Sequence, residues 1–136
     1  SSYSSPHLVE LAGRRQVLNF NADGLFAHDL EDGQVLWSYP WISNPEERNN
    51  VCQPVRIPDS GAGGRNRVFI SSGYGKGGDL FTIKQRDQQF IPNKVWSNRN
   101  LKAKFTSVVL RDDFIYGLDD GILVCLDVNT GKRAWK

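Results

Sequence analysis

Few residues of this sequence have the type and spacing that catalysis needs. His7 and His28 are the only histidines. They lie in separate expected strands, where a packed or surface histidine is commoner than a catalytic base or a metal ligand. The acidic pairs 112–113 and 119–120 could supply two carboxylates for acid–base chemistry, but each borders a hairpin, where aspartate is expected to form turns. No nucleophile has an evident partner, so these residues favour a non-catalytic protein.

Two short motifs resemble ligand-binding loops without the context that such loops require. Residues 73–78 match G-x-G-x-x-G, but the segment that follows has a strand pattern, whereas a dinucleotide site needs a helix N-terminus at the pyrophosphate. Asp127 and Asn129 resemble the start of a calcium loop, but Gly131 stands where another oxygen ligand belongs. We interpret both motifs as turns and predict no cofactor-binding or metal-binding residues from them.

Composition and charge exclude several classes of protein. The chain has 136 residues, of which 39% are hydrophobic, so it can form a core and is not a disordered tail. Its net charge is +2 and its basic residues are scattered, which argues against a nucleic-acid partner. No apolar run approaches the roughly 20 residues of a membrane helix. Cys52 and Cys125 are too few for a disulfide scaffold, and either two buried thiols or one disulfide would satisfy them.

Short apolar runs separated by Gly, Asn and Asp predict an all-β chain with tight hairpins. Glycines in the segments 22–24, 31–33, 119–121 and 129–131 can adopt the positive φ that such turns require. The run 122–126 does not alternate polar with apolar residues, which predicts a strand covered on both faces and therefore stacked sheets. The expected strands are 7–11, 16–19, 25–29, 35–39, 51–57, 68–71, 80–84, 94–96, 105–110, 114–118, 122–127 and 133–135.

An internal repeat organises these strands. The pattern Asp-x-x-x-Gly-x-x-x-Trp occurs twice, and a third, degraded copy keeps only the tryptophan. The positions are Asp29, Gly33 and Trp37, then Trp96, and then Asp127, Gly131 and Trp135. Once the polar loops 44–50 and 59–67 are set aside, the period fits the roughly 40 to 50 residues of a four-stranded propeller blade. We expect Asp to accept turn amides and Trp to pack against the next blade.

The segment 121–135 resembles the tryptophan-docking motif of pyrroloquinoline-quinone-type (PQQ-like) repeats, and the segments 105–116 and 5–11 are similar to inner strands of that family. The family includes quinoprotein dehydrogenases and the outer-membrane-protein assembly lipoprotein. The resemblance implies β-propeller blades, here at about 5–41, 50–98 and 103–136. It also implies a bacterial periplasmic, cell-envelope or secreted location. About three blades are too few to close a ring, so the expected fold is an incomplete propeller.

We therefore expect a non-catalytic scaffold that binds other proteins or further propeller blades, through loops such as 44–50 and 59–64 or by self-association of exposed blade faces. The alternative is a fragment of a quinoprotein dehydrogenase, for which the resemblance implies PQQ, calcium and a vicinal cysteine pair. The sequence has no adjacent cysteines. A third hypothesis is sugar binding, because Trp41 and Tyr74 lie near loops where an aromatic ring could contact a sugar.

Overall fold

The computed structural model describes residues 3–46, 48–58 and 66–136, and all of its regular structure in these ranges is β-strand. Twelve strands form three four-stranded antiparallel sheets, as the sequence predicted. Sheet 1 contains β1 (His7–Leu11), β2 (Arg14–Asn21), β3 (Gly24–Asp29) and β4 (Val35–Pro40). Sheet 2 contains β5 (Val55–Ile57), β6 (Asn66–Ser72), β7 (Gly77–Arg86) and β8 (Gln89–Asn98). Sheet 3 contains β9 (Val109–Arg111), β10 (Phe114–Asp119), β11 (Ile122–Asp127) and β12 (Arg133–Trp135).

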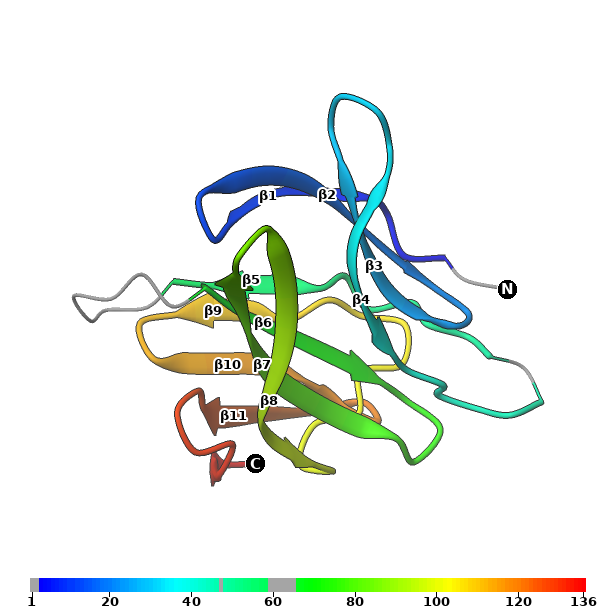
Figure 1. Cartoon of the computed structure of the whole chain (residues 1–136). Helices are drawn as coiled ribbons and strands as arrows, with labels where there is room; N and C mark the ends of the chain where they lie inside the picture. Colours follow the sequence, from blue (N-terminus) through cyan, green and yellow to red (C-terminus); the bar gives the residue numbers. More distant parts are fainter. Residues whose placement is uncertain (1–2, 47, 59–65) are drawn as a thin grey trace.

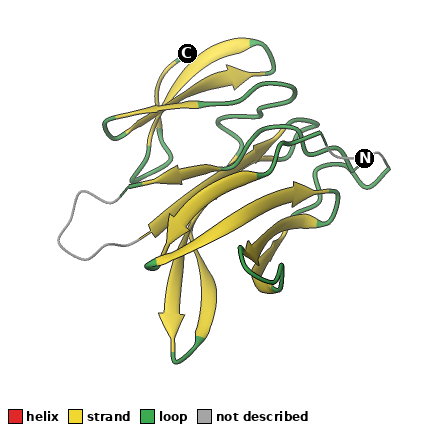
Figure 2. Ribbon diagram, turned by 90° about the horizontal axis from the view of Figure 1, so that it is seen from above, coloured by secondary structure: helices red, strands yellow, loops and turns green. Residues whose placement is uncertain are grey.

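Each sheet is a simple meander in which consecutive strands are neighbours, which fits blades of an incomplete propeller. Figure 1 shows sheet 2 between the other two sheets, and Figure 2 shows the strands from above with the loops that join them. The described residues include no helix that is both long and apolar enough to cross a membrane. The expected interaction loop 59–64 lies outside the described residues, as does position 47 of the loop 44–50.

The strand boundaries differ from expectation mainly in sheet 2. β5 begins at Val55 rather than at residue 51, because Pro54 has no N–H to donate to a ladder. β8 spans Gln89–Asn98 instead of 94–96, so that β7 and β8 form a long hairpin. Pro92 disfavoured a strand there, but β8 is an edge strand of sheet 2, where a missing N–H can face away from the ladder. In sheet 3, β9 is confined to Val109–Arg111.

The three tryptophans of the repeat occupy the same position in their sheets. Each lies opposite a residue of the third strand, and the register shifts immediately after that pair. The pairs are Trp37 with Ala27, Trp96 with Leu80, and Trp135 with Cys125. A shared bulge of this kind re-aims the strand around the indole. The second sheet therefore keeps the local geometry of the repeat although it has lost the Asp and the Gly.

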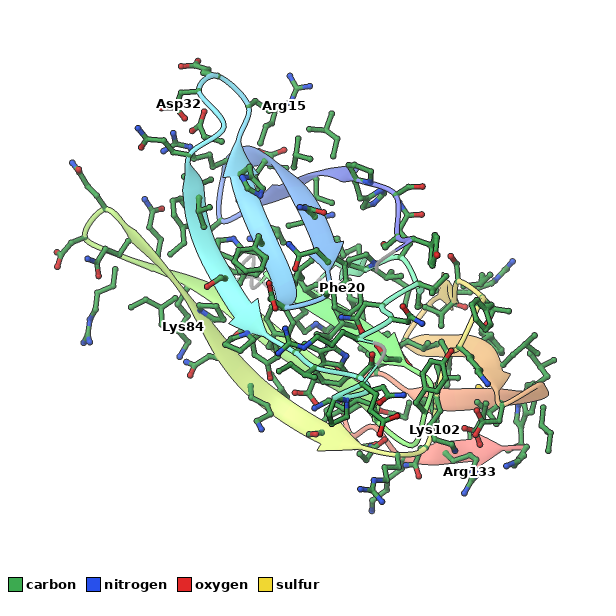
Figure 3. All side chains as sticks on the ribbon, turned by 90° about the vertical axis from the view of Figure 1, so that its right-hand side faces the viewer. Arg15, Phe20, Asp32, Lys84, Lys102 and Arg133 are labelled. Atoms are coloured by element: carbon green, nitrogen blue, oxygen red, sulfur yellow. The ribbon has the colours of Figure 1, made fainter. Side chains whose placement is uncertain are left out.

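Two hydrophobic cores hold the sheets together, one on each face of sheet 2. Alternate residues of a strand point to opposite faces, so Val68 and Ile70 of β6 pack with sheet 1, whereas Phe69 packs with sheet 3. Phe20, labelled in Figure 3, contributes to the first core, and Ile115 of β10 contributes to the second. Sheet 2 is consequently covered on both faces, which explains why most residues of β6 and β7 are buried.

The expectation that the run 122–126 is covered on both faces is wrong in this structure. Val124 and Leu126 are buried against sheet 2, but Leu123, which points to the opposite face, is 51% exposed. The reason is that the described residues place a neighbouring sheet on only one face of sheet 3. The same apolar pattern is fully covered only in the central sheet.

Asp119 at the end of β10 is a buried carboxylate rather than a simple turn residue. Its Oδ1 accepts a hydrogen bond from the Lys102 amide at 3.1 Å, and its Oδ2 accepts one from the Lys136 ammonium at 3.0 Å. The Lys102 ammonium also contacts Oδ1. Burial by itself raises the pKa of Asp119, but the bonds from the two lysines lower it by more, so the net pKa lies below its usual value. The carboxylate thus fixes the connection between sheets 2 and 3.

This arrangement predicts acid sensitivity. Because the pKa of Asp119 is lower in the folded chain than the value of about 3.9 in the unfolded chain, its stabilising effect is complete above about pH 4. That effect is lost as the pH falls through the folded pKa. Asp119→Asn should therefore unfold at lower urea concentration at neutral pH and lose less stability on acidification. Tryptophan fluorescence at a series of pH values measures both, with the exposed Asp113→Asn as the control. Parallel pH profiles for wild type and Asp119→Asn would contradict the assignment.

Candidate functional site

The repeat residues of sheet 3 build a tight turn, which we call the sheet-3 turn (residues 127–131). Asp127 Oδ1 accepts hydrogen bonds from the amides of Asn129 at 2.8 Å and Thr130 at 2.9 Å. The amide of Gly131 donates to the Asp127 carbonyl at 2.8 Å, and Gly131 has a φ of +71°. Aspartate and glycine are therefore needed for the backbone of the turn and not for chemistry.

Sheet 1 contains a turn of the same design, the sheet-1 turn (residues 29–33). Asp29 Oδ1 accepts the Glu31 amide at 2.7 Å, and the Gly33 amide donates to the Asp29 carbonyl at 3.1 Å with a φ of +73° at Gly33. The hydrogen bond from Glu31, followed by the Arg14 guanidinium, holds the pKa of Asp29 below its usual value. The two turns share the hydrogen bond from the glycine amide to the aspartate carbonyl, and they differ in the partners of the aspartate side chain and in what lies against them.

Trp96 of sheet 2 lies directly on the sheet-3 turn. Its Nε1 donates to the Val128 carbonyl at 2.7 Å, and the indole covers Gly131 so closely that a Cβ there would lie 2.6 Å from Cδ2 of Trp96. Asn98 and Asn100 each donate a side-chain amide to the Gly131 carbonyl at 2.9 Å. The sequence analysis predicted no role for either asparagine. The signal in the sequence was that Asn98 and Asn100 follow Trp96 by two and four residues, because residues at this spacing in an extended segment lie on the same face.

No described residue covers the sheet-1 turn in the same way. A Cβ at Gly33 would have no atom within 4 Å, and Leu30 is 45% exposed, whereas Val128 at the matching position of the sheet-3 turn is fully buried. Figure 3 shows Asp32 of this turn and Arg133 of β12 at opposite ends of the molecule. The sheet-1 turn therefore resembles the sheet-3 turn, but no indole covers it among the described residues.

Trp37 of sheet 1 contacts sheet 2 in a different way, because sheet 2 has no such turn. Its Nε1 donates to Gln16 Oε1 at 2.7 Å within sheet 1, and its ring meets the edge of Phe81 at 5.8 Å. Tyr39 stacks on the same Phe81 with ring centroids 4.2 Å apart. An aromatic cluster thus joins sheets 1 and 2, whereas a turn and an indole join sheets 2 and 3.

Trp135 of sheet 3 is the tryptophan without a covering sheet, and 47% of it is exposed. Within the described residues its ring contact is Tyr116, with centroids 6.0 Å apart. Tyr116 pairs with Val109 and with Cys125, and Cys125 pairs with Trp135, so these side chains share one face of sheet 3. Val109 is 64% exposed on that face. We call this surface the outer face of sheet 3.

Comparison with known proteins places this repeat geometry in a family. The family model described as "Outer membrane protein assembly factor BamB", a PQQ-like repeat model, matches residues 1–136. The chain belongs to this family. The match extends over all three sheets, and it confirms the resemblance to PQQ-like repeats. No curated protein and no solved structure matches the chain.

Other proteins with PQQ-like repeats hold a quinone and calcium, but the described residues of this BamB-family chain do not fit such a site. Across residues 3–46, 48–58 and 66–136, no three His, Cys, Asp or Glu side chains gather closely enough to hold a metal ion. His7 Nδ1 lies 3.0 Å from Gln53 Nε2, whereas His28 Nδ1 lies 3.0 Å from the Gly33 carbonyl, so the histidines are in different surroundings. We assign no catalytic step to these residues.

The cysteines are buried free thiols, so of the two alternatives left by the sequence the disulfide is not formed. Burial raises the pKa of the Cys52 thiol to about 12. Because the thiolate is the reactive form, we expect Cys52 not to react with a chromogenic disulfide reagent at about pH 8 while the chain is folded. Cys125 is only 2% exposed, so we expect the reagent not to reach it in the folded chain. Both should react once guanidinium chloride unfolds it. Rapid reaction of the native chain would contradict the burial of the two thiols.

The two turns allow a matched test of the indole contact. Gly33→Ala should cost about 1 to 2 kcal/mol, because alanine disfavours a positive φ. Gly131→Ala should lose the same amount and about 1 to 3 kcal/mol more, because its methyl group would collide with Trp96. Urea unfolding of both variants measures the difference. Equal losses would show that the indole does not press on the turn.

Proposed function

We propose that this BamB-family chain is a non-catalytic propeller segment that acts as an interaction scaffold. In this proposal the scaffold binds further propeller blades or other proteins through its first and third sheets. The observation that supports it is Trp135, which occupies the position of Trp96 in its sheet but remains half exposed. By family membership, we also propose a bacterial periplasmic, cell-envelope or secreted location.

The outer face of sheet 3 has the composition of a protein-binding surface. Val109, Leu123 and Trp135 are all exposed by about half or more. Aromatic and aliphatic side chains grouped on one sheet face are typical of surfaces that become buried on association. An exposed edge strand, β12, borders this face and offers unpaired backbone groups to a partner.

The contact between sheets 2 and 3 indicates which partner fits that face. An indole at this position needs a carbonyl acceptor and a glycine that lets the backbone approach, as Val128 and Gly131 provide for Trp96. The sheet-1 turn has the same backbone hydrogen bond from glycine to aspartate, and its glycine has open space around it. A further blade with an Asp-x-x-x-Gly turn, including sheet 1 of a second copy, is therefore the expected partner.

A fragment of a quinoprotein dehydrogenase is the alternative that family membership allows. It rests on the PQQ-like repeat alone, since the described residues offer no fitting donor set. Addition of PQQ and calcium, followed by absorbance and thermal unfolding, separates the two functions. The scaffold predicts no shift in either signal, and a saturable shift would favour the dehydrogenase.

We expect the chain to associate with itself in a concentration-dependent way in sedimentation velocity. Trp135→Ala should weaken this association at least about tenfold, because a truncated aromatic anchor typically costs an interface more than about 1.4 kcal/mol. Ile91→Ala, which truncates an exposed side chain on β8 of sheet 2, is the matched control and should have little effect. A monodisperse monomer at all concentrations would contradict pairing of the sheets, as would equal effects of the two substitutions.

A further inference from the structure

A polar cleft of about 680 Å³ lies between sheets 1 and 2, away from the outer face of sheet 3. The end of β4 and the segment after it form one wall, and the hairpin between β6 and β7 forms the opposite wall with the end of β8. The cleft contains Trp41 and Tyr74, the two aromatic residues that the sequence suggested for sugar binding. The structure therefore brings together two residues that are 33 positions apart.

A buried carboxylate lies in the cleft. Asp79 is only 5% exposed, and its Oδ2 accepts the hydroxyl of Tyr39 at 2.5 Å. Burial and the nearby carboxylate both raise the pKa of Tyr39, so the phenol keeps its proton and remains the donor. Among the described residues no hydrogen bond reaches Oδ1 of Asp79. Oδ1 is not among the buried polar atoms that lack a partner, so it is accessible and can accept a hydrogen bond from a hydroxyl group of a ligand.

Three cationic side chains line the same cleft. They are Lys76, Lys94 and Arg99, and none of them forms a salt bridge with a described carboxylate. Against the single charge of Asp79 they leave the cleft with a net positive charge. Cations that converge on a cleft without an acidic partner favour an anionic ligand.

The hairpin 73–78 owes its glycines to packing and not to phosphate binding. A Cβ at Gly77 would lie 2.2 Å from the Asn98 carbonyl, and a Cβ at Gly78 would lie 2.7 Å from the Phe69 ring. Gly75, by contrast, has a φ of +76° and open space around it, so the backbone conformation of the turn and not packing favours glycine there. The G-x-G-x-x-G motif thus shapes the cleft without supplying a helix N-terminus.

The aromatic rings of the cleft are already in contact with lysines. The Lys76 ammonium lies 4.5 Å from the centre of the Trp41 ring, and the Lys104 ammonium lies 4.7 Å from that of Tyr74. These cation–π contacts hold the two lysine side chains beside the cleft. Recognition here therefore depends on charge and hydroxyl groups more than on stacking of a ring on the aromatic faces.

We propose that this cleft binds an acidic sugar, a pyranose ring with a carboxylate, as in a uronate oligosaccharide. The sugar carboxylate binds Lys94 or Arg99, both of which line the cleft, and a ring hydroxyl donates to Oδ1 of Asp79. A neutral sugar would not contact the cations through a charge, and a simple anion would offer no hydroxyl group to Oδ1 of Asp79. Only a ligand that has both groups satisfies the whole cleft.

The test is isothermal titration of the chain with a galacturonate oligosaccharide and with a neutral glucose oligosaccharide of the same length. The acidic oligosaccharide should bind at least tenfold more tightly, and the difference should shrink as salt is added. The double variant Lys94→Gln, Arg99→Gln should bind it at least tenfold more weakly. Lys132→Gln, which removes one exposed charge outside the cleft, is the control and should bind as the wild type does.

Three results would overturn the proposal. These are equal binding of the acidic and neutral oligosaccharides, equally tight binding of acetate or inorganic phosphate, and loss of binding in Lys132→Gln. Asp79→Asn should also weaken binding, and because Asp79 is buried its folding must be checked by circular dichroism. If it does not fold, the exposed pair Lys94 and Arg99 still decides the question. Trp135→Ala should bind the sugar normally, so failure of the scaffold function and failure of this site are distinguishable.

Discussion

The structure depends on one constraint, which is that each four-stranded sheet must cover its apolar faces with a neighbouring sheet. Removal of apolar surface from water is the dominant favourable term in folding, so an apolar sheet face is stabilised when another sheet covers it. Trp96 shows how the constraint is met, since its indole donates to Val128 of the next sheet and closes over Gly131. Sheet 2 meets it on both faces and contributes to both cores of the described chain. Among the described residues no sheet covers the outer face of sheet 3, and this exposed face is the physical basis of the proposed scaffold function.

The loss of Asp and Gly from the second repeat changes the architecture around it. Without the Asp-x-x-x-Gly turn the hairpin of β7 and β8 continues to a two-residue turn between Arg86 and Gln89, so that Trp37 has no such turn to lie on. Trp37 instead contacts Phe81 of sheet 2, and Tyr39 stacks on the same Phe81 ring. The hydroxyl of the same Tyr39 then reaches Asp79 in the polar cleft. The degraded repeat and the cleft between sheets 1 and 2 are therefore connected through Tyr39, which stacks on Phe81 and donates its hydroxyl to Asp79.

Much of the fold follows from local pattern, and most of the site does not. The glycine-containing hairpins, the three tryptophan positions and the all-β class were predictable because turn formation and strand propensity depend on near neighbours. The length of β8 was not, because Pro92 disfavours a strand unless that strand lies at a sheet edge. Burial of both faces was expected for the run 122–126 and was found instead in β6 and β7. An apolar strand indicates that it needs cover but not which sheet provides it.

The sequence by itself determined the repeat, its turns and its family. Asp127 and Gly131 form their turn through hydrogen bonds between residues at most four positions apart, so the pattern is sufficient to recognise it. Only the tertiary structure decided which of the two turns is covered by a tryptophan of another sheet. Trp96 meets Val128 across 32 positions and Trp41 meets Ser72 across 31, and both contacts depend on how the sheets stack. The same stacking buries Asp79, gathers three cations near it and leaves Trp135 exposed, because contacts between sheets are set by the packing of whole faces and not by local spacing.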